Sequence, residues 1–186
     1  MSTIGFDTSN YTTSTAWTDG KTDINVRQIL YVKDGERGIR QSDGVFQHMK
    51  LMPVMYEKLS EQIDFKDVKA VGVSTRPRCV EGSYMPVFLA GEGYAKVVAN
   101  TLGVPLYEFS HQDGHIMAGI YSSGSFELLE NDFISVHLSG GTTEILKSRY
   151  NGFHFDNEII GGSKDISAGQ FIDRVGVKMG LHFPAG

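Results

Sequence analysis

A strand–turn–strand pattern occurs twice in the chain, once near each end, and it constrains the fold more than any other feature. The first copy has an apolar β run at 4–9 and an alternating run at 13–17, and the second has runs at 133–141 and 142–146. In both copies the first run ends in small hydroxyl or glycine residues, whose donors can surround an anion. The repeat predicts a duplicated domain with a nucleotide in the cleft between its halves.

The composition is that of a globular protein. The chain has 186 residues, 40% hydrophobic and 21% charged, and no apolar run approaches the roughly 20 residues that a membrane helix needs. The single cysteine, Cys79, excludes an internal disulfide and suits a reducing compartment. The N-terminus leads directly into a predicted strand and does not resemble a signal peptide. We therefore expect a cytoplasmic protein that does not enter a membrane.

The charge distribution restricts nucleic-acid binding to a local patch. A net charge of −5 argues against a protein that coats nucleic acid without help. Phosphate contacts depend on where the basic residues lie, so this charge is still compatible with a basic patch. Solvated charges scattered over the surface are the alternative. The basic residues considered for such a patch are Arg76, Arg78, Lys147, Arg149, Arg174 and Lys178.

The order of the predicted elements is typical of an α/β fold. Three strands come first, followed by helix–strand alternation, and then three strands and a helix again. The predicted strands are 2–7, 12–18, 26–32, 68–74, 105–109, 133–139, 142–148 and 153–160. The predicted helices are 46–62, with Pro53 bending it or marking its first turn, 87–102, capped by Gly103, 112–121 and 167–179. Antiparallel strands that lead into strand–helix units predict a mixed sheet.

Two domains are expected, and the second is incomplete. Residues 1–121 should form a complete five-stranded α/β domain, residues 122–131 a linker, and 132–186 only the start of a second copy. We expect a fragment of a longer protein, the alternative being a naturally short second domain. An unfinished copy would leave a sheet edge and an apolar helix face uncovered, which favours a homodimer or a poorly ordered C-terminus.

Two histidines form the clearest candidate metal site. If residues 111–115 are helical, His111 and His115 project from one face at i and i+4, close enough to share a metal ion. This spacing also occurs in zinc peptidases, but Gln112 stands where those enzymes need a glutamate as general base, which disfavours a metallopeptidase. Two ligands are fewer than the usual three, so a third must come from elsewhere. A polar helix start is the alternative.

Further polar residues are candidates for binding a nucleotide. Residues 139–143 can form a phosphate cradle, with a plain tight hairpin turn as the alternative. Asp173 can reach a ribose hydroxyl from its predicted helix, although a surface carboxylate is an equal alternative. Asp7, at the end of the first strand, is suited to orienting a metal-bound water. The methionines at 49, 52 and 55 and Trp17 are expected in the core.

Several motifs in this order resemble the tRNA threonylcarbamoyladenosine synthase catalytic subunit family, long labelled O-sialoglycoprotein endopeptidase or glycoprotease. The motifs are D-T-S at 7–9, H-Q-D-G-H at 111–115, L-S-G-G-T-T at 138–143 and the run D-I-S-A-G-Q-F-I-D-R-V-G-V-K-M-G-L-H-F-P-A-G at 165–186. The resemblance covers essentially all of this chain and a little over half of a typical member. It implies the duplicated actin-like, sugar-kinase-like and Hsp70-like (ribonuclease H-like) fold.

The resemblance also implies site residues and a reaction. It makes His111 and His115 ligands of one iron or zinc ion per subunit, with an aspartate beyond Gly186 as the third ligand. It implies transfer of a threonylcarbamoyl group from its adenylate to an adenine beside the tRNA anticodon, together with partner subunits. It assigns these residues to the adenine nucleotide: Leu138, Ser139, Gly140, Gly141 and Thr142 to the phosphates, and Asp173 and Gly186 to the nucleoside.

The chain departs from the family at three motifs near the expected chemistry. The family's T-S-C-D-E loop is replaced after Ser9 by Asn10, Tyr11 and Thr12, its Gly-Pro-Gly turn by residues 76–78, and the histidine of its S-G-G-H by Thr142. The departures indicate a divergent paralogue. The alternatives are a non-catalytic paralogue that recruits partners through the helix near 46–62, and a small-molecule kinase or carbamoyltransferase with Asp7 as base.

Overall fold

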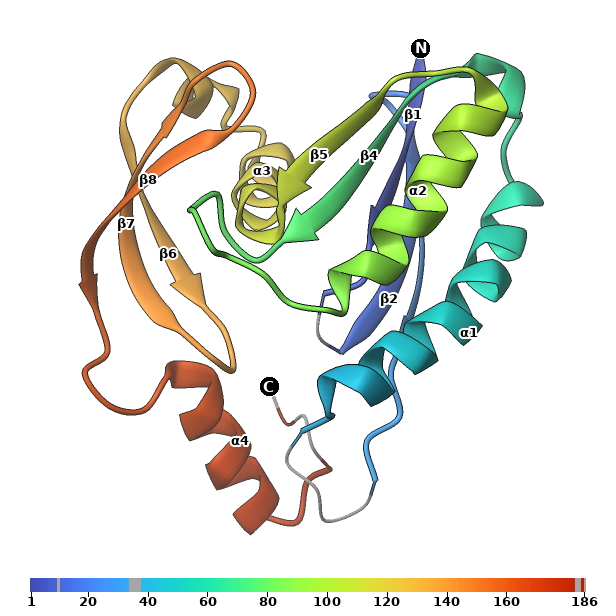
Figure 1. Ribbon diagram of the computed structural model, residues 1–186. Helices are drawn as coiled ribbons and strands as arrows, with labels where there is room; N and C mark the ends of the chain where they lie inside the picture. Colours follow the sequence, from blue (N-terminus) through green and yellow to red (C-terminus); the bar gives the residue numbers. More distant parts are fainter. Residues whose placement is uncertain (10, 34–37, 183–184, 186) are drawn as a thin grey trace. The chain divides into compact units, whose positions relative to one another are not determined.

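The computed structural model of the chain describes residues 1–9, 11–33, 38–182 and 185. The chain divides into two compact units, Met1–Gly114 and His115–Gly186, which are coloured from blue to green and from yellow to red in Figure 1. The division falls within helix α3 (His111–Ser123).

Unit 1 is built on the predicted mixed sheet. Its five strands have the order β3-β2-β1-β4-β5; β1, β2 and β3 are antiparallel, whereas β4 and β5 run parallel to β1. Their bounds are β1 (Ser2–Asp7), β2 (Thr12–Thr18), β3 (Asp23–Ile29), β4 (Val68–Arg76) and β5 (Leu106–Ser110). The α/β fold class and the mixed sheet are therefore confirmed.

Strand β3 lies three residues earlier than the predicted range 26–32. A tight turn sets its register, because the Asp19 side chain accepts hydrogen bonds from the backbone N–H groups of Lys21 and Thr22. Pairing then runs residue by residue from Thr18 with Asp23 to Thr12 with Ile29. The turn residues, rather than the apolar run, determine where this strand begins.

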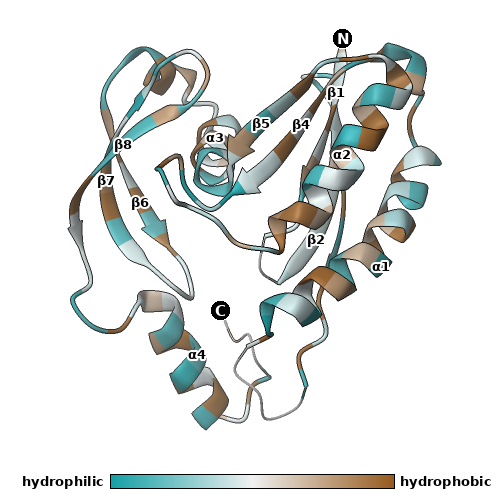
Figure 2. Cartoon of the chain, in the orientation of Figure 1, coloured by the Kyte–Doolittle hydropathy of each residue, from teal (hydrophilic) through white to brown (hydrophobic). Residues whose placement is uncertain are grey.

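Helices α1 (Gln41–Ser60) and α2 (Phe88–Leu102) pack against the sheet of unit 1 and against each other (Figure 1). A short 3₁₀ helix, η1 (Phe65–Asp67), precedes β4. The apolar residues of β4 and α2 appear brown in Figure 2. The buried core consists of Ile4, Phe6, Met52, Leu59, Val68, Val71, Val73, Ala95 and Ala99. Small alanines on α2 let this helix lie close to β4 and β1.

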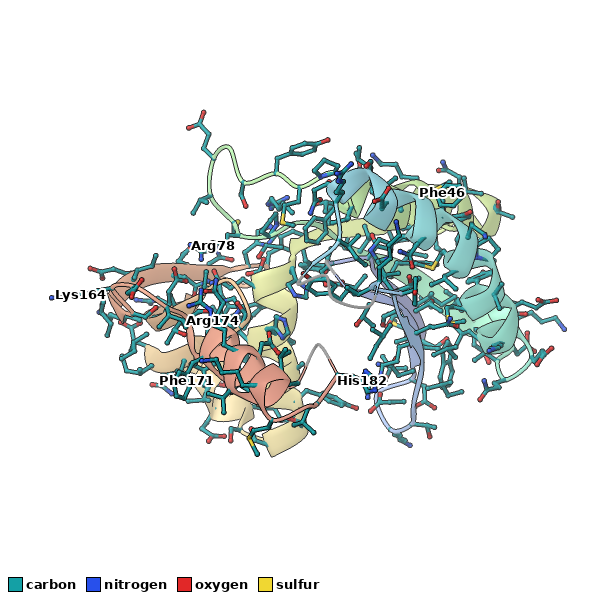
Figure 3. All side chains as sticks on the ribbon, turned by 90° about the horizontal axis from the view of Figure 1, so that it is seen from below. Phe46, Arg78, Lys164, Phe171, Arg174 and His182 are labelled. Atoms are coloured by element: carbon teal, nitrogen blue, oxygen red, sulfur yellow. The ribbon has the colours of Figure 1, made fainter. Side chains whose placement is uncertain are left out.

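Helix α1 differs from its predicted range 46–62. It begins at Gln41, and Pro53 lies within it without ending it. A proline lacks the N–H that would bond the carbonyl four residues earlier, and here the Tyr94 hydroxyl of α2 donates to that carbonyl, on Met49, at 3.1 Å. Met49 was expected in the core but is 47% exposed, and Phe46 of α1 is 65% exposed (Figure 3). Met52 and Met55 are buried as expected.

Unit 2 contains a smaller antiparallel sheet with the order β6-β7-β8. Its elements are the 3₁₀ helix η2 (Phe126–Glu130), the strands β6 (Phe133–Leu138), β7 (Thr143–Tyr150) and β8 (Phe155–Gly162), and helix α4 (Ala168–Lys178). The predicted linker 122–131 is in fact the end of α3 followed by η2. The order β6-β7-β8 repeats that of β1-β2-β3, but no described strand pairs with the other edge of β6.

The repeat leaves apolar surface on unit 2. In unit 1, β1 lies between β2 and β4, whereas β6 is an edge strand of its sheet in the described part of the chain. Ile134, Val136 and Leu138 of β6 are each between 58% and 61% exposed. Phe171 of α4 is 60% exposed (Figure 3). A search of the described residues finds no helix with the length and apolarity needed to cross a membrane.

Candidate active site

Three parallel strands of unit 1 end at the same edge of its sheet. β1 ends at Asp7, β4 at Arg76 and β5 at Ser110, and the carboxyl ends of parallel strands form the usual ligand-binding edge of α/β sheets. The chain continues from Ser110 directly into α3, whose first residue is His111. Residues separated by 104 positions, Asp7 and His111, thereby come into contact.

Asp7 and His111 form an ion-pair geometry at this edge. His111 Nδ1 lies 2.9 Å from Asp7 Oδ2, and the Ser9 backbone N–H donates to Asp7 Oδ1 at 2.7 Å. Burial by itself raises the pKa of Asp7, but the hydrogen bond and charge of His111, with hydrogen bonds from Ser74 and Ser9, outweigh it and lower the pKa to about 2. The carboxyl group is thus ionised at neutral pH, so the His111 Nδ1–H is the donor.

A capping box fixes the start of α3. The Asp113 carboxylate accepts hydrogen bonds from the Ser110 backbone N–H and hydroxyl at 2.9 and 2.6 Å, and the Asp113 backbone N–H donates to Ser110 Oγ at 3.0 Å. Both side chains are buried. His111 is therefore held on a rigid helix start. Neither residue was predicted as part of the site, although the spacing S-x-x-D is the signature of such a box.

Thr8, next to Asp7, holds the end of β1 against α2. Its buried hydroxyl donates to the Val87 carbonyl at 2.8 Å and accepts from the Gly91 backbone N–H at 3.0 Å. A Cβ at Gly91 would lie only 2.8 Å from Thr8 Oγ1, so this contact needs a glycine. The Thr8 hydroxyl was expected to offer a donor to an anion, but its hydrogen atom is used within the fold.

His115 lies one helical turn after His111 on α3, so the two imidazoles project from neighbouring positions of one helix. The His115 ring is also in contact with the ring of His137 on β6, with centroids 5.7 Å apart. A third ligand for both α3 histidines is not found among the described residues. No imidazole, thiolate or carboxylate there forms a group with His111 and His115 in which all ligand atoms lie within 4.8 Å of one another. His137 was not singled out from the sequence, since a lone histidine in an alternating strand carries no signal of its own.

The turn at Ser139 is a tight hairpin closed by its own hydroxyl. Ser139 Oγ accepts from the backbone N–H groups of Gly141 at 3.2 Å and Thr142 at 2.9 Å, and the Ser139 backbone N–H donates to the Thr142 carbonyl. A phosphate bound at this turn would have to replace the Ser139 hydroxyl. Leu138, just before the turn, is 61% exposed.

The N-terminus of α4 packs on this turn. Ser167 caps the helix by accepting from the Gln170 N–H and donates to the Gly140 carbonyl at 2.9 Å. The Gly169 N–H donates to the Ser139 carbonyl, and a Cβ at Gly169 would lie 2.5 Å from that oxygen. The second strand–turn–strand element and the following helix therefore form one local unit.

Asp173, the expected nucleoside contact on α4, accepts a hydrogen bond from the Ala185 backbone N–H at 2.8 Å. The carboxylate thus lies beside Ala185, the residue before Gly186. Gly186 itself lies outside the described residues.

A comparison with protein families identifies the chain's relatives. Residues 36–186 match the family of tRNA N6-adenosine threonylcarbamoyltransferases. The chain belongs to this family. The match extends over most of unit 1 and all of unit 2, so it includes both α3 histidines and the turn at Ser139.

Curated tRNA N6-adenosine threonylcarbamoyltransferases are 31–37% identical to the chain. The relative from Christiangramia forsetii is 31% identical over 137 residues, which are 73% of this chain and 38% of the relative. The relative from Moorella thermoacetica is 35% identical over 141 residues, 75% of this chain and 38% of the relative. The chain thus spans well under half the length of the threonylcarbamoyltransferases that it matches.

Solved structures establish that the fold is actin-like. The ethanolamine utilization protein EutJ from Carboxydothermus hydrogenoformans superposes with a TM-score of 0.53 and 16% identity, covering 98% of this chain and 58% of EutJ. YeaZ from Pseudomonas aeruginosa superposes with a TM-score of 0.50 and 11% identity, covering 90% of this chain and 68% of YeaZ. Both neighbours are members of the actin-like class, so the fold expected for the threonylcarbamoyltransferase family is confirmed.

Proposed function

We propose that this chain carries the metal-binding and nucleotide-binding residues of a transferase that moves a threonylcarbamoyl group onto a tRNA adenosine. The observation that carries the proposal is the Asp7–His111 pair at the carboxyl edge of a sheet in a member of the threonylcarbamoyltransferase family. The chain spans about 38% of the relatives' length. The complete reaction therefore involves residues outside those that align here.

The arrangement around His111 suits a transition-metal ligand. Metal-bound histidines usually donate their second ring N–H to a carboxylate, which fixes the orientation of the imidazole. Asp7 occupies that position at 2.9 Å from His111 Nδ1, so His111 Nε2 would be the ligand atom. His115 adds a second imidazole from the next turn of α3, and imidazoles suit iron or zinc. Such an ion, when bound, polarises a phosphate or acyl oxygen.

The proposed role of Asp7 is to orient His111 and, with it, a metal-bound water. Both oxygens of the Asp7 carboxylate already accept hydrogen bonds, Oδ2 from His111 Nδ1–H and Oδ1 from the Ser9 N–H. This argues against the alternative of a small-molecule kinase in which Asp7 removes a proton from the substrate. In the other alternative, a non-catalytic paralogue, Asp7 would not need to take part in a reaction.

The proposed adenine-nucleotide site lies in unit 2. Gly140 and Gly141 have no Cβ and allow a phosphate to approach the backbone, with Leu138, Ser139 and Thr142 completing the turn. The phosphate would take the hydrogen bonds that Ser139 Oγ now accepts from Gly141 and Thr142. Asp173 and Gly186 are the proposed nucleoside contacts.

The proposed partners follow from the family. Transfer RNA is the acceptor, and partner subunits complete the modification complex in the cytoplasm. The edge of β6 that pairs with no described strand, together with the exposed apolar residues of β6, also permits a homodimer through this strand.

A metal titration tests the proposal directly. Zn(II) binding to the complete chain should weaken at least about tenfold when His111 or His115 is replaced by alanine, because each supplies one ligand. His182→Ala is the matched control, since His182 is exposed and outside α3 (Figure 3). Equal affinities for all four proteins would refute the shared metal site. Asp7→Asn should weaken binding less than either ligand variant.

A further inference from the structure

Arg76 lies at the edge of the sheet that carries Asp7 and His111. It is the last residue of β4, and after a register shift at Thr75 it pairs with Ser110, the residue before His111. Register shifts of this kind redirect side chains and are common beside active sites. Arg76 is therefore part of the same edge as the Asp7–His111 pair.

The turn that follows Arg76 is fastened in place. The Gln112 backbone N–H of α3 donates to the Pro77 carbonyl at 3.0 Å. The Arg78 backbone N–H donates to Ser83 Oγ at 3.0 Å, which holds the loop that carries the labelled Arg78 side chain in Figure 3. The start of α3 is thus hydrogen-bonded to the turn that contains Arg76 and Arg78.

The Arg76 guanidinium has only neutral partners among the described residues. It donates to Thr75 Oγ1 at 3.3 Å and to Cys79 Sγ at 3.7 Å, and it forms no ion pair in the described ranges. The Asp7 carboxylate on the same edge is bonded to His111 and Ser9. A guanidinium has five N–H donors. Arg76 is therefore a half-buried cation, and the described part of the chain offers few acceptors to its donors and no carboxylate to its charge.

We infer that Arg76 binds a phosphate group of the substrate. This inference rests on the proposed function, which supplies two sources of phosphate: the adenylate donor and the backbone of the acceptor RNA. The planar guanidinium matches two phosphate oxygens at once. It would also give the candidate site a positive charge, although the chain as a whole has a net charge of −5.

The test compares Arg76→Gln with Lys69→Gln in the complete chain. Lys69 is exposed at the opposite end of the same strand, so its variant makes the same charge change away from the site. Arg76→Lys keeps the charge but loses the two-pronged geometry. The two probes are AMP, followed by NMR titration, and a short anticodon stem–loop RNA, followed by fluorescence anisotropy at several salt concentrations.

Each probe reports on one source of phosphate. If Arg76 binds the adenylate, Arg76→Gln weakens AMP binding about tenfold, Arg76→Lys weakens it less, and Lys69→Gln leaves it unchanged. If Arg76 binds RNA, Arg76→Gln lowers the slope of log affinity against log salt by about 0.7–0.9. The inference is overturned if both probes bind Arg76→Gln as they bind the wild type, or if neither probe binds the wild type.

The metal titration separates this inference from the proposed function. Arg76→Gln should bind Zn(II) as the wild type does, which also shows that the variant is folded. One outcome rejects only the role of Arg76: the His111→Ala variant binds Zn(II) more weakly, as expected, but Arg76→Gln binds both phosphate probes as the wild type does. The proposed function would then still stand. Unchanged Zn(II) affinity in the His111→Ala variant rejects the proposed metal site whatever Arg76 does.

Discussion

The two strand–turn–strand elements have similar sequences but are held in different ways. After β1, the turn residues bond to distant parts of the chain: Thr8 to Val87 and Gly91 of the α2 region, and Asp7 to His111. After β6, Ser139 closes its own hairpin, and the turn also bonds to the nearby start of α4. The first turn joins elements across its unit, whereas the second is a local structure.

The difference follows from the number of elements that surround each turn. β1 lies inside a five-stranded sheet with α2 close by, so its polar side chains are buried and need partners. β6 is an edge strand in the described part of the chain, and its turn is largely exposed to water. A buried polar group is costly to leave without a partner, but an exposed one can bond to water. Substitutions in the first turn should therefore affect stability more than those in the second.

The largest effect is expected for Thr8→Val. Valine keeps the shape of threonine but removes the acceptor of the buried Gly91 N–H and one donor to the buried Val87 carbonyl, which still accepts from the Ala90 N–H at 3.4 Å. Unfolding by urea should show a loss of about 2–3 kcal/mol, because an unpaired buried N–H costs about 1–3 kcal/mol and the bond to the Val87 carbonyl is lost as well. Thr101→Val is the control, since its hydroxyl only bonds an exposed carbonyl within α2. Equal losses in the two variants would contradict the proposed role of Thr8.

The next largest effect is expected for Asp7→Asn. Asparagine keeps an oxygen for the Ser9 N–H but removes the charge that strengthens the bond from His111. The free energy of unfolding should fall by about 1–2 kcal/mol, since both side chains are roughly 30% exposed and partly screened. The His111 ¹⁵N resonances should also shift. Asp165→Asn, an exposed site, should change neither quantity.

Most of the fold was predictable because its signals are local. The apolar runs of β1 and β4, the left-handed Gly103 that ends α2 at φ 67°, and the alternation in β7 are all visible in the sequence. The extent of α1 was not, because the bond from Tyr94 that lets the helix continue through Pro53 joins residues 45 positions apart. Such compensation has no local signature.

The candidate site was predictable only in part for the same reason. The spacing of His111 and His115 suggested that both lie on one helix, and the first strand suggested Asp7. The bond between Asp7 and His111 depends on β1 and β5 being parallel to β4 between them, which is a property of the whole sheet. The position of Arg76 beside Ser110 depends in addition on a register shift that no motif records.

Two glycines of α2 should change the free energy of unfolding less, and in opposite directions, when each is replaced by alanine. Gly91→Ala should lower the free energy of unfolding by about 1–2 kcal/mol, because the new Cβ would lie 2.8 Å from Thr8 Oγ1. Gly93→Ala, where nothing lies within 4 Å of the new Cβ, should raise it by about 0.5–1 kcal/mol through helix propensity. Thermal unfolding of both variants measures this difference. Stabilisation by both would show that α2 can move away from the end of β1.

The smallest effect is expected for Ser139→Ala in the second turn. The change removes the acceptor used by the N–H groups of Gly141 and Thr142, but Gly141 is exposed and water can replace the hydroxyl there. The free energy of unfolding should therefore fall by no more than about 1 kcal/mol. Amide hydrogen exchange should become faster at Gly141 and Thr142 but stay unchanged at Gly91. A loss as large as that of Thr8→Val would mean that the two turns are equally integrated into their units, and the contrast between them would fail.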